Sequence, residues 1–386
     1  MDLSFSPAQT AARETAARIA QQILAPAAED LDRTGRFPRD ALAAIAKAGL
    51  LGVNVPRALG GLEAGVVAYS LAVTELAKAC AATTVAVCVS NMVAEVIASF
   101  GTEQQVRTHV PRLVSGDYTV GAFALSEPGA GSDPGSMRTQ ARWDGSGWVI
   151  DGTKAWITSG TDAGLFVVWA RTRPGQGTRG ISCFLVPAQT PGLTVGRPER
   201  KMGLRGSTTT MLSFDGCRVP QEALLGEEGK GFRVAMMALD GGRIGIASQA
   251  LGIGLAALEV ATAHARERRQ FGRPIADFQA VQWRLADMAT NLEAARLLAL
   301  QAASRKEAGL SFTREASMAK LFASERAVEA CNLALDVLGA RGYRRDGGPV
   351  ERYFRDVRVT TIYEGTSEVQ RIVLSRQIAR RFGGGA

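Results

Sequence analysis

The spacing of apolar residues divides the chain into three blocks, and the first block is helical. From Ser6 to about Asp117, residues such as Ala12, Ala16 and Ile19 recur on one face of a helix. Ser6 precedes a proline, which is the arrangement expected where an N-cap is followed by proline at the first helical position. We therefore predict an N-terminal domain built from helices.

The second block, from Thr119 to about Pro220, has a period of two. Short apolar runs such as GWVIDG and LFVVWART end at Gly, Pro or Asp, which is typical of β-strands. Trp143, Asp144 and Gly145 are the signal of a hairpin turn. No helical pattern in this block is long enough for a crossover, so we expect an antiparallel sheet or a small barrel.

The helical period returns after Gly231 and lasts to the end of the chain. Leu285, Met288 and Leu292 fall on one helix face, and long helices joined by short turns predict an antiparallel bundle of four helices. The predicted fold class is α+β: an N-terminal helical domain, a middle antiparallel β-barrel domain and a C-terminal four-helix bundle. The expected domains are residues 1–118, 119–229 and 230–386.

Composition agrees with a globular chain. Of 386 residues, 46% are hydrophobic and 21% are charged. The longest uncharged stretches, Ala79 to Ala94 and Ile244 to Leu258, are shorter than the roughly 20 apolar residues of a membrane span, so we expect no transmembrane helix. The first residues mix acids and bases without an apolar run, and we expect neither a signal nor a transit peptide, which predicts a cytoplasmic protein.

Cysteine, histidine and charge narrow the chemistry. Five scattered cysteines without a CxxC pair indicate reduced thiols, and two isolated histidines disfavour a metal centre or a Ser-His-Asp hydrolase, so we expect no metal. The net charge of +8 favours anionic partners, which include nucleic acid, phosphorylated cofactors and coenzyme A. The one dense basic cluster, Arg266 to Arg273, is too short for a nucleic-acid-binding tail.

A glycine-rich segment, GAFALSEPGAGSD, opens the β block at Gly121. The small residues Gly129, Ala130 and Gly131 let the backbone approach a flat or phosphorylated ligand with its N–H groups. An ordinary glycine-rich turn explains the same residues. The segment is not a dinucleotide fingerprint, because GxGxxG is absent and no helix follows.

Three further segments combine a ligand-binding interpretation with a structural one. In KAWITSG, Trp156 and Thr158 are suited to stacking on and hydrogen bonding to an aromatic cofactor, or Trp156 is simply core. In DGGR, an Asp at the head of an apolar helix is equally explained by the helix dipole. Around Arg268 the basic residues also fit a last helical turn.

The segment YEGTSE, near the C-terminus, contains the most unusual carboxylate. Thr366, Ser367 and Glu368 fit the start of a helix, with a capping hydroxyl and an acid in the first turn. Glu364 precedes that cap and follows an apolar run, where a charge is costly unless it is used or paired.

Five motifs together carry a family resemblance: ALSEPGAGSD, AWITSG, LDGGRIGIASQALGIG, RRQFGRPI and IYEGTSEVQR. In this order and at these distances, the chain resembles the acyl-CoA dehydrogenase family over essentially its whole length, most closely the short-chain, butyryl-CoA branch. The α, β, α order matches that family's architecture.

The resemblance implies a non-covalent FAD. Loop residues from Phe123 would line the flavin, Trp156 would lie against its ring, and Arg268 and Gln279 would reach the FAD of a neighbouring subunit. The implied cofactor-binding residues are Phe123, Leu125, Ser126, Gly131, Ser132, Trp156, Ile157, Thr158, Arg268, Phe271, Gln279, Asp336, Val337, Leu338, Gly339, Ala340, Thr366, Ser367 and Glu368.

The resemblance also implies the reaction. Glu364 matches the general base that removes an α-proton from an acyl-CoA, the β-hydrogen leaves as hydride to flavin N5, and the product is a trans-2-enoyl-CoA. Some branches place the base immediately before the arginine that Arg243 matches, but here that residue is Gly242. The implied substrate contacts are Ser132, Asp240, Arg243 and Gly365.

The family further implies an electron-transfer flavoprotein as acceptor and a homotetramer, a dimer of dimers with FAD at the dimer interface. The segment DVLGARG departs from the family pattern at Asp336 and Ala340, and an Asp near a pyrophosphate repels it unless a cation such as Arg341 compensates. Glu95, in an uncharged stretch, is either a paired structural carboxylate or a pocket residue that recognises or rejects a polar acyl end.

Two alternatives to the dehydrogenase stay open on the same fold. One is a flavin oxidase or monooxygenase, in which oxygen reaches the reduced flavin. The other is a DNA-binding relative without dehydrogenase activity, which would need an additional basic domain; we expect no nucleic-acid partner.

Overall fold

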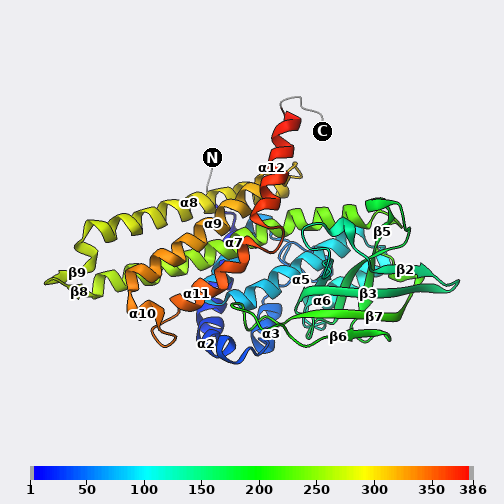
Figure 1. The fold of residues 1–386 in the computed structure, drawn as a ribbon, viewed down its shortest axis with the longest axis horizontal. Coiled ribbons are helices and arrows are strands. Elements are labelled where there is room, and N and C mark those ends of the chain that lie inside the picture. The colour runs from blue at the N-terminus through cyan, green and yellow to red at the C-terminus, as the bar shows by residue number, and fades with distance from the viewer. Residues whose placement is uncertain (1–3, 382–386) are drawn as a thin grey trace.

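The computed structural model describes residues 4–381, and the three blocks of the sequence follow one another along it (Figure 1). Long helices lie side by side through the middle of the molecule, and the β-sheet lies at one end (Figure 1). The predicted architecture of N-terminal helices, middle β-sheet domain and C-terminal helices is confirmed. The finer domain boundaries stay a prediction.

The N-terminal block is helical, as its spacing predicts. Ser6 caps its first helix, because its side chain accepts a hydrogen bond from the backbone N–H of Gln9 and the Gln9 side chain accepts one from Ser6 N–H. The elements are α1 (Pro7–Ile19), the π-helical turn η1 (Ala20–Leu24), α2 (Ala25–Thr34), α3 (Arg39–Lys47), η2 (Arg57–Leu59), α4 (Gly65–Ala79), α5 (Ala81–Phe100) and α6 (Glu103–Val114).

The middle block forms one sheet of seven strands, ordered β1-β4-β2-β3-β7-β6, with β5 paired to β4. The predicted hairpin joins β2 to β3, and Asp144 Oδ1 accepts the backbone N–H of Ser146 and Gly147 in its turn. The strands are β1 (Gly121–Ala124), β2 (Gln140–Trp143), β3 (Gly147–Thr158), β4 (Leu165–Arg171), β5 (Ile181–Pro187), β6 (Leu193–Val195) and β7 (Thr209–Pro220).

The expectation of a purely antiparallel sheet is wrong at strand β4, which pairs in parallel with β1 and, at Gln140 opposite Arg171, with β2. Strand β1 pairs with β4 in parallel, from Gly121 opposite Leu165 to Ala124 opposite Val168. A parallel pair needs a long crossover, and the sequence pattern excludes only a helical one. Here the crossover is the β2–β3 hairpin, which belongs to the same sheet.

The C-terminal block is dominated by three long helices that pack on one another, α7, α8 and α9, with α12 packed on α9. Helix α7 also packs against α4 and α5, so it joins this block to the N-terminal helices. The elements are α7 (Gly231–Glu267), β8 (Arg269–Gln270), β9 (Arg273–Pro274), α8 (Gln279–Glu307), α9 (Thr313–Leu338), α10 (Ala340–Tyr343), α11 (Val350–Val357), η7 (Arg358–Thr361) and α12 (Ser367–Arg381).

Among residues 4–381, two helices are long and apolar enough to cross a membrane by length and composition, Ala81–Phe100 and Gly231–Glu267. Within their most apolar windows, 89% and 78% of the residues are buried inside the protein. Buried helices of this kind are hydrophobic all round because they pack against other elements on every side. We interpret α5 and α7 as core helices.

Candidate active site

Glu364 lies in the short connection between η7 and α12, in an unusual backbone conformation. Its φ is +53° and that of Gly365 is +87°, so two consecutive residues are left-handed. This conformation costs a non-glycine residue roughly 1–2 kcal/mol and persists only where neighbouring groups hold it. Gln370 Nε2 donates to the carbonyl oxygens of both residues, at 3.1 and 3.0 Å, and Lys320 Nζ donates to that of Gly365 at 2.7 Å.

The carboxylate of Glu364 occupies space left by a glycine on α7. A β-carbon built at Gly242 would lie 2.6 Å from Glu364 Oε2 and 3.2 Å from its Cδ, closer than real contacts allow. Position 242 corresponds to the place where some branches of the family that this chain resembles carry their general base. In this fold a side chain at 242 and the carboxylate of Glu364 thus compete for one place, and Gly242 leaves it to Glu364.

The environment of this carboxylate favours its protonated form. Burial raises the pKa of Glu364 to about 7, against the opposing attraction of Arg243 and Lys320. Oε2 is buried and has no hydrogen-bond partner among residues 4–381. A carboxylate with one buried, unpartnered oxygen and a pKa near neutrality is suited to accepting a proton from a ligand.

The same burial predicts a pH-dependent gain of stability when Glu364 is replaced by glutamine. The folded state holds the Glu364 proton above the ordinary pKa of 4.5, so this contribution to stability is present at acid pH and is lost as the pH rises through about 7. We expect Glu364→Gln to raise the free energy of unfolding by about 2–3 kcal/mol near pH 8, since glutamine carries no buried charge.

Urea unfolding of the two FAD-saturated proteins at several pH values measures this difference. The gain should shrink toward zero as the pH approaches 4.5. A gain that stays constant from acid to alkaline pH would show that the charge of Glu364 is not its cause.

Arg243 and Asp240 lie beside this centre on α7. Arg243 Nη1 bonds Asp240 at 2.5 Å and Ser317 Oγ at 3.3 Å, and Thr313 Oγ1 donates to Asp240 Oδ2 at 2.6 Å. The helix-dipole explanation for Asp240 is wrong, because α7 begins at Gly231 and Asp240 lies well inside it. The Nε of Arg243 is buried without a partner within the described residues, so this group has capacity left for a ligand.

The glycine-rich loop and the end of β3 lie next to each other. Ala155 N–H donates to Ser126 O at 2.9 Å, and Phe123 packs on Trp169 with ring centroids 4.2 Å apart. Leu125 and Ile157 are buried, so only their backbone can face a ligand. The other predicted residues here are partly or fully exposed: Phe123, Ser126, Gly131, Ser132, Trp156 and Thr158.

A buried ion pair fixes this loop from behind. Lys154, whose side chain is fully buried, donates to Glu127 Oε1 at 2.9 Å and to Leu125 O at 3.1 Å. Glu127 also accepts the backbone N–H of Arg138 and Thr139, at 2.6 and 3.0 Å. Burial lowers the pKa of Lys154 to about 8 although Glu127 opposes that shift. Sequence reasoning missed this pair, although a lysine inside a buried strand was a signal.

The segments predicted to reach a neighbouring subunit's cofactor meet at a cavity of about 550 Å³. Arg268 lines it together with Val337, Leu338, Gly339 and Ala340, as predicted from the sequence, and Arg341 lines it too. The remaining predicted residues, Phe271, Gln279 and Asp336, do not line the cavity and are exposed. The cation Arg341 therefore lines the same cavity as Ala340, whereas the carboxylate of Asp336 lies outside it.

The cap of α12 is confirmed, because Thr366 Oγ1 accepts the backbone N–H of Val369 at 3.2 Å. Ser367 Oγ is buried without a partner within residues 4–381, and Glu368 is exposed. Gly365 carries the strained backbone next to Glu364.

Comparison with known sequences assigns the chain to a family. Sequence models of the N-terminal, middle and C-terminal domains of acyl-CoA dehydrogenases match residues 6–117, 122–217 and 229–379. The chain belongs to the acyl-CoA dehydrogenase family. It is thus an enzyme of a family of flavin-dependent oxidoreductases, as the five motifs predicted.

Individual acyl-CoA dehydrogenases are similar along nearly the whole chain. The mitochondrial short-chain specific acyl-CoA dehydrogenase of Mus musculus is 47% identical over 96% of this chain and 90% of its own length. The butyryl-CoA dehydrogenase of Megasphaera elsdenii superimposes with a TM-score of 0.96 at 39% identity, over 98% of this chain and 100% of that one. A chain of a structure described as the electron transferring flavoprotein of Acidaminococcus fermentans gives 0.97 at 42% identity, with coverage of 98% and 100%.

The residues of this acyl-CoA dehydrogenase fit the flavin that its family uses. The indole of Trp156 is 65% exposed beside the glycine-rich loop, an unusual position for a large aromatic ring without a ligand. Gly129 and Gly131 have no atom within 4 Å of a β-carbon built on them, so the loop offers an open backbone surface. Both features suit a broad aromatic cofactor.

Lys320 and Lys306 of this acyl-CoA dehydrogenase site were also not predicted from its sequence. Lys320, a fully buried lysine on α9, holds Gly365, and Lys306 of α8 approaches Gly241. The buried helical face around Lys320 is otherwise formed by small residues, including Ala316, Ala319 and Ala323. A charge on such a face was the signal that could have identified Lys320.

Proposed function

We propose that this chain dehydrogenates a short-chain acyl-CoA between its α and β carbons, with FAD as cofactor and Glu364 as base. The observation that carries the proposal is the desolvated, unpartnered carboxylate of Glu364 at the space opened by Gly242. An α-proton of a thioester is a very weak acid, so its removal requires a base of raised pKa and stabilisation of the enolate. The identity to short-chain enzymes supports the choice of acyl-CoA.

The chain's own residues would act as follows. Glu364 would take the α-proton and keep it, because burial favours its protonated form. The backbone N–H of Glu364, in its left-handed conformation, would donate to the thioester oxygen as negative charge develops there. Arg243, with Asp240 holding it in place, would orient the acyl-CoA. The chemistry supplied by bound FAD is acceptance of the β-hydrogen as hydride.

The cofactor would be held by two surfaces. The loop from Phe123 to Ser132, Trp156 and the start of α12 would form one, and Arg268 with the segment from Val337 to Ala340 would form the other for the FAD of a neighbouring subunit. This arrangement supports a homotetramer with FAD at a dimer interface. We further propose an electron-transfer flavoprotein as acceptor, supported by the likeness to a chain in a structure of such a protein.

An anaerobic panel of acyl-CoA thioesters tests the proposal. The panel runs from propionyl-CoA to dodecanoyl-CoA, and we expect its short-chain members to bleach the flavin fastest, with trans-2-enoyl-CoA as product. A best substrate longer than octanoyl-CoA would contradict the short-chain assignment. Rapid reoxidation of the substrate-reduced enzyme by air would instead favour the oxidase on the same fold.

A further inference from the structure

A small cavity leads away from the base toward a polar end wall. Gly242 and Met92 line it, and a β-carbon built at Gly242 would lie 2.6 Å from Glu364 Oε2 and 3.1 Å from Met92 Sδ. Its free space of about 10 Å³ is enough for about one water molecule. The cavity thus lies next to the space that the Glu364 carboxylate occupies and has room for one more small group.

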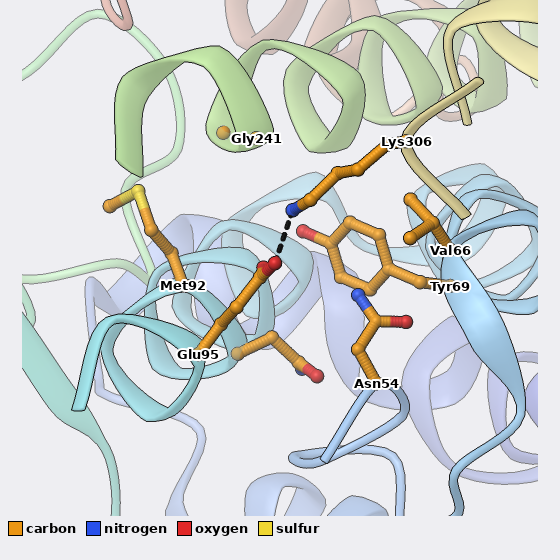
Figure 2. Close-up of a pocket in the computed structure, with 9 residues that line it drawn as sticks. Asn54, Val66, Tyr69, Met92, Glu95, Gly241 and Lys306 are labelled. Carbon is orange, nitrogen blue, oxygen red and sulfur yellow. Dashed lines mark ion pairs between the residues drawn. The ribbon is translucent and has the colours of Figure 1, made fainter. Parts of the chain in front are cut away.

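The end wall is an ion pair between Glu95 of α5 and Lys306 of α8 (Figure 2). Their side chains are 35% and 16% exposed, and Lys306 Nζ lies 2.7 Å from the position of a β-carbon at Gly241. Figure 2 shows Asn54 and Tyr69 beside this pair. Asn54 Oδ1 is buried and has no hydrogen-bond partner within residues 4–381.

The chemistry of this wall favours a neutral polar group. The ion pair has no net charge, so a terminal carboxylate would gain Lys306 but face Glu95, and an ammonium would face the reverse. An alkyl end would remove water from both charges without replacing its hydrogen bonds. A hydroxyl can donate to Glu95 and accept from Lys306, and it is the size of the water for which the cavity has room.

The distance from the base limits the length of the acyl group. Positions 241 and 242 are consecutive, with Cα atoms about 3.8 Å apart, so Lys306 Nζ and Glu364 Oε2 are at most about 12 Å apart. Allowing about 3 Å for each contact at the two ends, the second carbon and the terminal oxygen are separated by about 6 Å at most. Four or five carbons satisfy this limit.

We propose that the acyl group taken by this site is a four- or five-carbon chain with a terminal hydroxyl, recognised by Glu95 and Lys306. This inference rests on the proposed function and names its substrate class. The hydroxyl takes no part in the reaction: the α-proton goes to Glu364, the β-hydride goes to FAD, and the product is the hydroxy-2-enoyl-CoA.

The test compares 4-hydroxybutyryl-CoA with butyryl-CoA, which differ only in that hydroxyl. Calorimetric titration of the FAD-loaded Glu364→Gln protein measures binding without turnover, and we expect 4-hydroxybutyryl-CoA to bind about tenfold more tightly. Flavin bleaching of the wild-type enzyme should show a similar ratio of kcat/KM. Equal or weaker binding of the hydroxylated thioester would overturn the inference.

Variants of Glu95 and Lys306 test whether the preference for the hydroxylated thioester arises at this ion pair. In the Glu364→Gln protein, Lys306→Met should bring the ratio of the two dissociation constants close to one, and Glu95→Gln should reduce it in the same direction if Lys306→Met does not fold. Lys78→Met is the matched control, because it removes a half-buried lysine paired with Glu75 and Glu259 elsewhere in the fold, and the ratio should keep its wild-type value. A ratio unchanged by both wall variants would also overturn the inference.

The outcomes separate this inference from the proposed function. If no acyl-CoA bleaches the wild-type flavin, the proposed dehydrogenation itself fails. If butyryl-CoA bleaches it as fast as or faster than 4-hydroxybutyryl-CoA, dehydrogenation stands and the hydroxyl recognition fails.

Discussion

Replacing Glu364 by glutamine is expected to slow reduction of the flavin by a short-chain acyl-CoA by about a thousandfold or more. Glutamine keeps the size of the side chain but cannot accept the α-proton. Arg243 and Lys320 lie close enough to influence the pKa of Glu364, but Arg243 stays cationic and Lys320 Nζ is held on the carbonyl oxygen of Gly365. The bleaching rate after rapid anaerobic mixing measures the effect.

A matched control distinguishes loss of the base from loss of the fold. Glu75→Gln removes a carboxylate paired with Lys78 on α4 and should bleach at nearly the wild-type rate. The Glu364→Gln protein should still carry its full complement of FAD, visible in its absorbance. Bleaching by Glu364→Gln at the wild-type rate would contradict the assignment of the base.

Replacing Lys154 by methionine is expected to cost about 3–5 kcal/mol of stability. The substitution keeps the volume of the side chain but leaves the carboxylate of Glu127 buried without its cation. It also removes the hydrogen bond to Leu125 O, inside the segment predicted to line the flavin. Urea unfolding of the FAD-saturated protein measures the loss.

The control for this prediction breaks an exposed ion pair. Arg107 pairs with Glu103 on the surface of α6, at 2.5 Å, with both side chains more than 70% exposed. Such pairs contribute about 0–1 kcal/mol, so Arg107→Met should barely move the unfolding midpoint. If Lys154→Met destabilised the protein no more than Arg107→Met, the buried pair would not be what holds the loop.

The sequence predicts features that depend on neighbours along the chain. The N-cap at Ser6, the hairpin at Asp144 and the cap at Thr366 each need only a few adjacent residues, and all three are present. The three-block architecture follows from periodicity, which is also a local property.

Local sequence patterns do not predict contacts between segments that are distant along the chain. The parallel pairing of β1 with β4, the approach of Lys320 to Gly365 and the fit of Glu364 against Gly242 join residues far apart in the sequence. The apolar run that follows Asp240 predicts a helix start at this residue, but α7 begins nine residues earlier, at Gly231. The sequence leaves Glu95 open between a structural and a pocket role. In the structure it is paired with Lys306 and lines the small cavity, and its recognition of an acyl end stays a prediction.

The dependence of the bleaching rate on pH tests the central claim most directly, because that claim concerns one dry carboxylate. With acyl-CoA kept far below saturation, the rate reports the ionisation of the free enzyme. We predict that it rises with pH and levels off above about 7, the pKa to which burial raises Glu364. A rate that levels off near the ordinary pKa of 4.5, or does not change with pH, would contradict the account.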